Sequence, residues 1–320
     1  MAPADRGRDV LIIGSAGYVG TRMSAAFDRA GYRVAGLQRP GGTPVSPAYR
    51  RVPGDLADPP SLVAAAGGFD LVIHLGAILG PDLDLAGIDA LIEAGSPIIV
   101  TSGSDVLGAG DVDEDDEPRP HPLVGWRDEV ERRALAAGHR VIRPGLIYGS
   151  GGGVVHNMMI PVAERLGAGV YVGAPDVCWG AVHVDDLPPL YLNVARLAAP
   201  GTAWNAVAEN VRVDRLATLV GRGKSISWPE DEEVPAEYAP IAGLFRLHQV
   251  VGSEKTRREM RWTPRHLDAV ASLARELALD SPQPRSGKAR EMVDTVDIDA
   301  GRDGSPGPAA GISSNVLEAS

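Results

Sequence analysis

The first half of the chain alternates short apolar runs with stretches of helical periodicity. Apolar runs of strand length occupy residues 9–13, 33–37, 49–52, 71–75, 97–101 and 140–142. Helical patterns occupy residues 17–30, 60–66, 84–94 and 126–137. Unbroken apolar strands between helices are typical of a parallel sheet that is covered on both faces. The pattern therefore predicts the α/β class, with a Rossmann-type doubly wound parallel sheet that binds its ligand at the carboxyl ends of the strands.

Beyond residue 149 the pattern is less regular. Helical patterns at 157–166, 187–197 and 214–220 are separated by short apolar runs and by a proline-rich acidic loop at 228–240. We expect a flexible N-terminus at 1–8, a nucleotide-binding core at 9–150, and a smaller substrate-binding lobe at 151–279. This C-terminal lobe would carry a lid and close back on the core. Residues 280–320 are rich in glycine, serine, proline and charge, which predicts a disordered tail.

Composition narrows the partners that we expect. The chain has 320 residues and a net charge of −11, with no basic block, which argues against nucleic-acid and anionic-membrane partners. Cys178 is the only cysteine, so an intrachain disulfide and a cysteine-based zinc site are excluded, and we expect no metal. Residues 1–8 lack the apolar core of a signal peptide and no apolar run has membrane-spanning length, so we expect a soluble cytoplasmic protein.

Three glycines follow the first apolar run at a spacing of three residues, Gly14, Gly17 and Gly20. The flanking patterns place them in a strand-to-helix turn. Glycine lets the backbone approach a pyrophosphate closely, and the helix N-terminus then faces the phosphate charge. The motif therefore predicts a dinucleotide site. Besides the glycines, the cofactor-binding residues expected in this turn are Ala16, Tyr18 and Val19.

The second apolar run ends in Gln38 and Arg39, without a carboxylate. In a Rossmann-type fold an acidic residue at this place binds the ribose hydroxyls of NAD, whereas a basic residue accepts the 2′-phosphate of NADP. The planar guanidinium of Arg39 can hold a phosphate through two hydrogen bonds, although an arginine in such a loop is often simply solvated. The position favours NADPH/NADP as the cofactor, with both Gln38 and Arg39 expected to bind it.

From residue 9 to about 278 the chain resembles an extended short-chain dehydrogenase/reductase of the epimerase/dehydratase-like branch. The resemblance is carried, in order, by the glycine motif and by the segments 54–56, 70–77, 143–149, 182–187 and 255–264, the last with Arg261 in place of a glycine. It implies a small-molecule substrate, and a homodimer is the assembly that it allows. The further cofactor-binding residues that it implies are Asp55, Leu56, Leu75, Gly76, Ala77, Thr101, Arg127, Pro144, Gly145, Leu146 and Ile147.

The catalytic positions depart from the family pattern. The family has Pro-Tyr-x-x-x-Lys-x-x-x-Glu, and Pro122 and Glu131 fix the register of that motif in this chain. Leu123 then stands at the tyrosine position and Arg127 at the lysine position. The strand-end motif that normally carries the catalytic serine places Gly103 at that position. All three members of the family's proton-transfer set have changed.

Loss of a general acid typically lowers the rate by about 10²–10⁴. Other groups could replace it, and the candidate catalytic residues are Ser102, Ser104 and Tyr148. The serines are equally suited to cap the strand-end turn, and the tyrosine to pack. The candidate substrate-binding residues are Gly103, Leu123, Trp126, Asn157 and His183. Helix packing for Trp126, helix capping for Asn157 and loop orientation for His183 are the alternative roles.

These departures favour an atypical NADPH-dependent ketoreductase. Its substrate would be a bulky aromatic ketone of the polyketide or angucyclinone type, in antibiotic or secondary-metabolite biosynthesis. A phenol on the substrate itself, or solvent, would supply the proton. The alternatives are a non-catalytic NADP(H)-sensing regulator and a sugar-nucleotide epimerase or dehydratase. The loop at 228–240 would serve an enzyme as a lid and a regulator as a surface for a protein partner.

Overall fold

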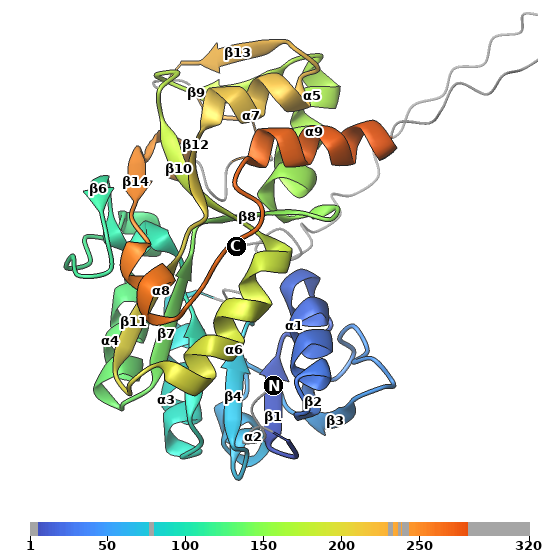
Figure 1. Cartoon of the computed structure of the whole chain (residues 1–320), viewed down its shortest axis with the longest axis vertical. Coiled ribbons are helices and arrows are strands. Elements are labelled where there is room, and N and C mark those ends of the chain that lie inside the picture. The colour runs from blue at the N-terminus through green and yellow to red at the C-terminus, as the bar shows by residue number, and fades with distance from the viewer. Residues whose placement is uncertain (1–5, 77–79, 230–232, 236–237, 239–242, 281–320) are drawn as a thin grey trace, which may run out of the picture.

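The computed structural model describes residues 6–76, 80–229, 233–235, 238 and 243–280 (Figure 1). Four of the predictions above fall wholly or partly outside these residues. They concern the flexible N-terminus at 1–8, Ala77 as a cofactor contact, the C-terminal tail, and much of the proline-rich loop at 228–240.

A seven-stranded sheet forms the centre of the molecule. Its strand order is β11-β7-β5-β4-β1-β2-β3, and every neighbouring pair is parallel. The strands are β1 (Asp9–Ile13), β2 (Arg33–Gln38), β3 (Arg50–Pro53), β4 (Leu71–His74), β5 (Ile98–Thr101), β7 (Arg140–Pro144) and β11 (Thr202–Ala206). The order reverses at β1, which confirms the predicted doubly wound, Rossmann-type α/β fold.

Helices cover both faces of this sheet because its strands are apolar on both sides. In β1, Val10 and Ile12 pack with α1 (Tyr18–Arg29) and α6 (Leu187–Leu197). The alternate residues Leu11 and Ile13 pack on the other face with α2 (Pro59–Ala66), α3 (Pro81–Glu93) and α4 (Trp126–Ala136). Successive side chains of a strand point to opposite faces, so both faces are buried.

The core is not continuous in sequence. Residues 187–206, which follow the predicted boundary at residue 150, supply α6 and the edge strand β11. The helix α6 packs against α1, and β11 pairs with β7. The chain therefore leaves the Rossmann layer after β7 and returns to it before building the rest of the lobe.

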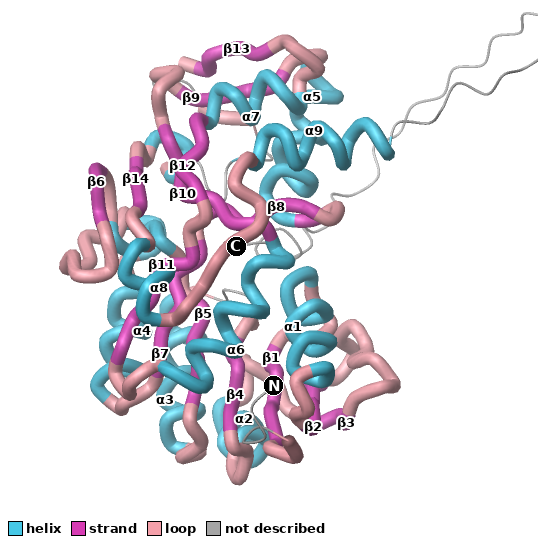
Figure 2. The backbone as a smooth tube through the Cα atoms, in the orientation of Figure 1, coloured by secondary structure: helices cyan, strands magenta, loops and turns pink. Residues whose placement is uncertain are grey.

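The remaining elements form a second lobe, seen at the opposite end of the molecule in Figure 2. Its strand β10 (Cys178–His183) pairs with β8 (Leu146–Gly149) and with β12 (Glu209–Arg212), and β9 (Gly169–Val172) pairs with β13 (Ser225–Trp228). Its helices are α5 (Ile160–Leu166), α7 (Val213–Val220) and α9 (Ala269–Asp280), with a π-helical turn η4 (Val155–Met159) before α5. Tyr148, Met159 and Leu216 are among the residues of its apolar core.

Short elements connect the two parts. The strands β6 (Gly110–Val112) and β14 (Gln249–Val251) pair in parallel, and α8 (Glu254–Glu259) follows β14. The 3-10 turns are η2 (Ser104–Leu107), η3 (Pro122–Val124), η5 (Val184–Asp186) and η7 (Leu244–Arg246). None of the helices in the described part of the chain is long and apolar enough to cross a membrane.

Two helix starts differ from the sequence prediction. The helix predicted from residue 84 begins at Pro81, because proline fixes a helical φ and its missing N–H is not needed in the first turn. The helix predicted from Asn157 begins earlier, as the π-helical turn η4, so Asn157 lies inside that turn with an exposed side chain. The predicted role of Asn157 as a helix cap is therefore wrong.

Candidate functional site

A cavity of about 270 Å³ opens at the carboxyl ends of the central strands. Its walls come from the turns that follow β1, β2, β3, β4 and β5, together with parts of α4, β8 and α6. This is the place where an open parallel sheet binds its ligands, since the strand order reverses at β1. The cavity therefore defines the candidate site.

The glycine turn forms one wall of the cavity. All seven residues from Gly14 to Gly20 line it. Gly14 has a φ of +86°, and a Cβ there would lie 2.8 Å from the carbonyl oxygen of Leu75. A Cβ on Gly20 would overlap the carbonyl oxygen of Gly14. Gly17 is the N-cap of α1 and offers no capping side chain, so the first N–H groups of the helix are available to an anion.

The end of β2 adds positive charge to the same cavity. Arg39 and Thr43 both line it, and the Arg39 guanidinium bonds to no residue that the structure describes. Gln38 does not line it. Its Oε1 accepts the N–H of Val45 at 2.8 Å and its Nε2 donates to the carbonyl of Arg39 at 3.0 Å, so Gln38 shapes the loop that presents Arg39. Thr43 was missed because nothing in the sequence fixes the path of this loop.

Asp55 and Leu56, after β3, line the next part of the cavity, as do Leu75 and Gly76 after β4. The carboxylate of Asp55 accepts the N–H of Ala57 at 3.0 Å, which holds the turn in shape. These four residues lie where the resemblance placed cofactor contacts.

His74 also lines the cavity at the end of β4. Its Nδ1 accepts the N–H of Gly76 at 3.1 Å, and burial lowers its pKa to about 4. The imidazole is therefore neutral at neutral pH, with its proton on Nε2, where it can donate to a ligand. Asp84, from α3, lines the cavity nearby and accepts the indole N–H of Trp126 at 2.8 Å. Trp126 thus bonds to a pocket residue rather than lining the cavity itself.

Thr101 and Ser102, after β5, line the cavity together with Arg127 and Tyr191. We call this part of the cavity its deep end. The hydroxyls of Thr101 and Tyr191 lie 2.7 Å apart and share a hydrogen bond. Ser102 Oγ is buried and has no hydrogen-bond partner among the described residues. Tyr191, on α6, was not predicted because only the return of the chain to the core brings it here.

Gly103 and Leu123, at the family's serine and tyrosine positions, do not line the cavity. A Cβ on Gly103 would overlap the carboxylate of Asp105. Leu123 lies in η3, and 42% of its surface is exposed.

Two candidate catalytic residues lie away from the cavity lining. Ser104 donates from Oγ to Oε1 of Gln249 at 3.1 Å, which ties η2 to β14. Tyr148 is fully buried in the core of the lobe, edge-on to His183, and burial raises the pKa of its phenol. In β8 it is Ile147 that faces the cavity, and Tyr148 points to the opposite side. Pro144, Gly145 and Leu146 are not among the lining residues either.

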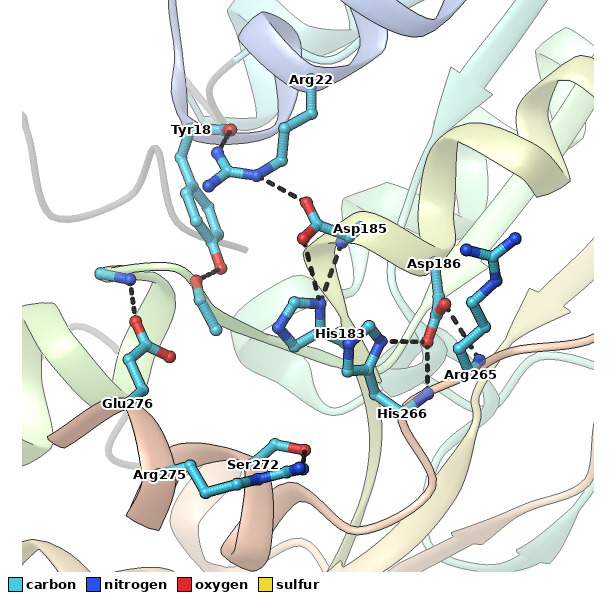
Figure 3. A network of polar contacts seen from close by, with 12 residues as sticks. Tyr18, Arg22, His183, Asp185, Asp186, Arg265, His266, Ser272, Arg275 and Glu276 are labelled. Carbon is cyan, nitrogen blue, oxygen red and sulfur yellow. Dashed lines mark hydrogen bonds and ion pairs between the residues drawn. The ribbon is translucent and has the colours of Figure 1, made fainter. Parts of the chain in front are cut away.

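A polar network connects the glycine turn with the lobe (Figure 3). The phenol of Tyr18 donates to the carbonyl of Gly149, and Arg22 pairs with Asp185 at 2.9 Å. His183 Nδ1 accepts the N–H of Asp185, and its ring stacks on His266 at 3.8 Å. His183 is thus part of a structural contact between the end of β10 and the segment before α9, not of the cavity lining.

Part of the chain matches a known family model, and most of the chain has distant relatives. Residues 10–96 match the model of the NAD dependent epimerase/dehydratase family. An uncharacterized protein of Saccharomyces cerevisiae is 24% identical over 297 residues, which are 85% of this chain and 99% of the yeast protein.

Solved structures share the fold. The dTDP-glucose 4,6-dehydratase of Bacillus anthracis, in complex with NAD, has a TM-score of 0.68 and 16% identity, covering 86% of this chain and 97% of its own. The protein MoeE5, in complex with UDP-glucuronic acid and NAD, has a TM-score of 0.66 and 19% identity, covering 85% and 99%. At these identities the likeness shows the fold.

Proposed function

We propose that the protein is an NADP(H)-dependent oxidoreductase of the extended short-chain dehydrogenase/reductase type. One observation carries the proposal most directly. The glycine turn at the N-terminus of α1 and the guanidinium of Arg39 line the same cavity, at the strand ends where dinucleotides bind. The family match over residues 10–96 and the NAD bound in related folds support a nicotinamide cofactor.

The residues present fit a dinucleotide. The absence of side chains at Gly14, Gly17 and Gly20 leaves room for the backbone to approach a pyrophosphate, and the α1 N-terminus favours its negative charge. When bound, the nicotinamide would supply hydride transfer. Besides the glycine turn, the lining residues that would hold the dinucleotide are Arg39, Thr43, Asp55, Leu56, Leu75, Gly76, Thr101 and Arg127.

Arg39 favours NADP(H) over NAD(H). A guanidinium with no partner in the described structure can donate two parallel hydrogen bonds to a phosphate, and Thr43 offers a hydroxyl beside it. No carboxylate follows β2 to bind a ribose diol in place of the phosphate.

Carbonyl reduction is the reaction that suits the deep end of the cavity best. Arg127 and Ser102 can stabilise negative charge that develops on a carbonyl oxygen, although Arg127 stays charged and cannot deliver a proton. A bulky aromatic ketone with a neighbouring phenol would supply that proton itself. Sugar-nucleotide epimerisation or dehydration, the second candidate, is favoured by the sugar-nucleotide ligand of MoeE5 but would need an acid-base group at the place of Leu123.

The cofactor assignment is tested by titrating NADPH and NADH into wild type, Arg39→Ala and Arg29→Ala. Arg29 is an exposed arginine at the far end of α1 and serves as the matched control. We expect Arg39→Ala to weaken NADPH binding by roughly 10- to 100-fold, as for a lost charged hydrogen-bond pair, and to leave NADH unchanged. An unchanged NADPH-to-NADH ratio in Arg39→Ala would overturn the assignment.

The reaction is tested in two panels. Oxidation of NADPH is followed with aromatic polyketide ketones, and conversion of sugar nucleotides in the presence of NADP⁺ or NAD⁺ is followed by chromatography, because epimerisation and dehydration consume no net cofactor. Turnover of the ketones alone supports the reductase. Turnover of the sugar nucleotides alone would replace it with the second candidate. No turnover in either panel, with tight NADPH binding retained, would overturn the enzyme assignment in favour of an NADP(H)-sensing protein.

A further inference from the structure

The volume of the missing serine side chain at position 103 is filled by two charged groups. A Cβ on Gly103 would overlap Oδ1 of Asp105 and would lie 3.0 Å from Nη1 of Arg127. The guanidinium and the carboxylate face each other there, with 3.5 Å between Arg127 Nη1 and Asp105 Oδ2. Only 10% of the Arg127 side chain and 17% of the Asp105 side chain are exposed. The glycine thus makes room for a largely buried ion pair.

The hydrogen-bonding groups of this ion pair are not all used by the described residues. Asp105 Oδ1 is buried without a hydrogen-bond partner among the described residues, and the same is true of Ser102 Oγ. Within the described residues, no group forms a hydrogen bond with the N–H donors of Arg127, whose charged neighbour is Asp105. Buried polar groups without partners are costly, and Ser102 and Arg127 both line the cavity, so a ligand there can complete the bonding of these two side chains.

The elements on which the pair stands are held firmly. Arg127 is the second residue of α4 and lines the cavity between Ser102 and the α3 side. Asp105 lies in η2, whose backbone is fixed by Gln249. The Nε2 of that glutamine donates to the carbonyls of Ser104 and Gly108 at 2.8 and 2.7 Å. A carboxylate on a braced turn can hold a long, flexible arginine in one orientation.

We infer that Asp105 is a positioning residue, which holds the Arg127 guanidinium against the deep end of the cavity so that its free N–H groups bind an oxygen of the nicotinamide-riboside half of the cofactor. This arrangement requires glycine at position 103, because a side chain on Gly103 would overlap the Asp105 carboxylate. The inference rests on the proposed function and goes beyond it, since it assigns roles to Asp105 and Gly103, which lie outside the cavity lining.

The test separates the two halves of the cofactor by comparing NADPH with adenosine 2′,5′-bisphosphate, which lacks the nicotinamide riboside. Both ligands are titrated into wild type, Asp105→Asn, Arg127→Gln and the double variant. We expect each single variant to weaken NADPH binding roughly 10-fold, and to change the affinity for the bisphosphate by less than about twofold. The double variant should be no weaker than Arg127→Gln alone, because Asp105 acts through Arg127.

Asp111→Asn is the matched control, an exposed aspartate on β6 outside the cavity, and should change neither affinity. Melting temperatures identify any variant that fails to fold. For that case Gly103→Ala offers a second route, since its methyl displaces the flexible end of Asp105 and should weaken NADPH alone, in the same sense as Asp105→Asn.

Equal weakening of both ligands by Asp105→Asn would show a structural role and overturn the inference. An unchanged NADPH affinity in Asp105→Asn would also overturn the inference. The same holds if the losses of NADPH affinity in the two single variants add up in the double variant. Failure of the proposed function has a different signature, in which Arg39→Ala leaves both phosphate-containing ligands unaffected.

Discussion

At the residue scale, Gly20 shows how little space the glycine turn has to spare. A methyl group there would overlap the carbonyl oxygen of Gly14, so Gly20→Ala must push the start of α1 away from the turn. We expect a loss of NADPH affinity of more than about 10-fold, because the helix N-terminus no longer faces the pyrophosphate. Calorimetric titration measures this loss.

Gly87→Ala is the control for that substitution. Gly87 lies inside α3, where a Cβ would make ordinary contacts at 3.9 Å. Alanine is the better helix former, so this variant should gain up to about 1 kcal/mol in unfolding free energy and keep its NADPH affinity. If the Gly20→Ala protein binds NADPH as tightly as the Gly87→Ala protein does, the proposal that the glycine turn holds the pyrophosphate is wrong.

His74 gives a prediction on pH. Burial lowers the pKa of its folded-state imidazole to about 4, below the value of about 6.5 in an unfolded chain. Between these values the unfolded state binds a proton that the folded state does not. Stability is therefore fully present above pH 6.5 and is lost as the pH falls toward 4, by up to about 3 kcal/mol from this residue.

His74→Asn keeps an acceptor for the Gly76 N–H and removes the titrating ring. Urea unfolding at several pH values should show a shallower decline for this variant between pH 6.5 and 4 than for wild type. The decline does not vanish, because burial also lowers the pKa of His139 and of His183. Identical slopes for wild type and variant would refute the assignment to His74.

At the element scale, the contact between η2 and β14 separates a structural serine from a catalytic one. Gln249 is 3% exposed and forms three hydrogen bonds with η2 and its following residue, one of them accepted from Ser104 Oγ. Gln249→Ala leaves two buried carbonyls without donors and should cost about 2–4 kcal/mol in unfolding free energy. Ser104→Ala removes one bond and should cost about 1 kcal/mol.

Thermal or urea unfolding measures both losses. Ser104→Ala should retain the NADPH affinity and any turnover of the wild type. A Ser104→Ala protein of unchanged stability that has lost turnover would instead make Ser104 a catalytic residue.

The elements themselves follow from the sequence because alternation and length are local properties. The apolar run at 9–13 is the strand β1, and the glycines after it begin α1. Pairing between strands that are far apart in the sequence was harder to predict. The seventh strand, β11, belongs to the central sheet only through its pairing with β7 across about 60 residues of chain.

The same distinction between local and distant contacts explains which residues of the candidate site could be predicted from the sequence. The glycine turn and Arg39 could be read from consecutive residues, and the structure places both on the cavity. Gln38 could not, since its amide bonds to Val45 after a loop has folded back. Asp105 was missed because its meaning depends on Arg127, on a different element, and on the room left by Gly103.

At the scale of the whole molecule, one cavity joins the turns that follow five strands of the central sheet. The glycine turn and Arg39 line it at the ends of β1 and β2. The deep end carries Arg127, which pairs with the largely buried carboxylate of Asp105 behind the lining. The network of Figure 3 joins α1 to the lobe, so the two parts of the protein meet beside the cofactor turn.

The central claim is that this cavity binds NADP(H) through the 2′-phosphate. Its most direct test is the ratio of the NADH and NADPH dissociation constants of the wild-type protein, measured by calorimetric titration at one fixed salt concentration. The account predicts that NADPH binds at least about 10-fold more tightly than NADH. Equal affinities, a preference for NADH, or no binding of either cofactor would contradict it.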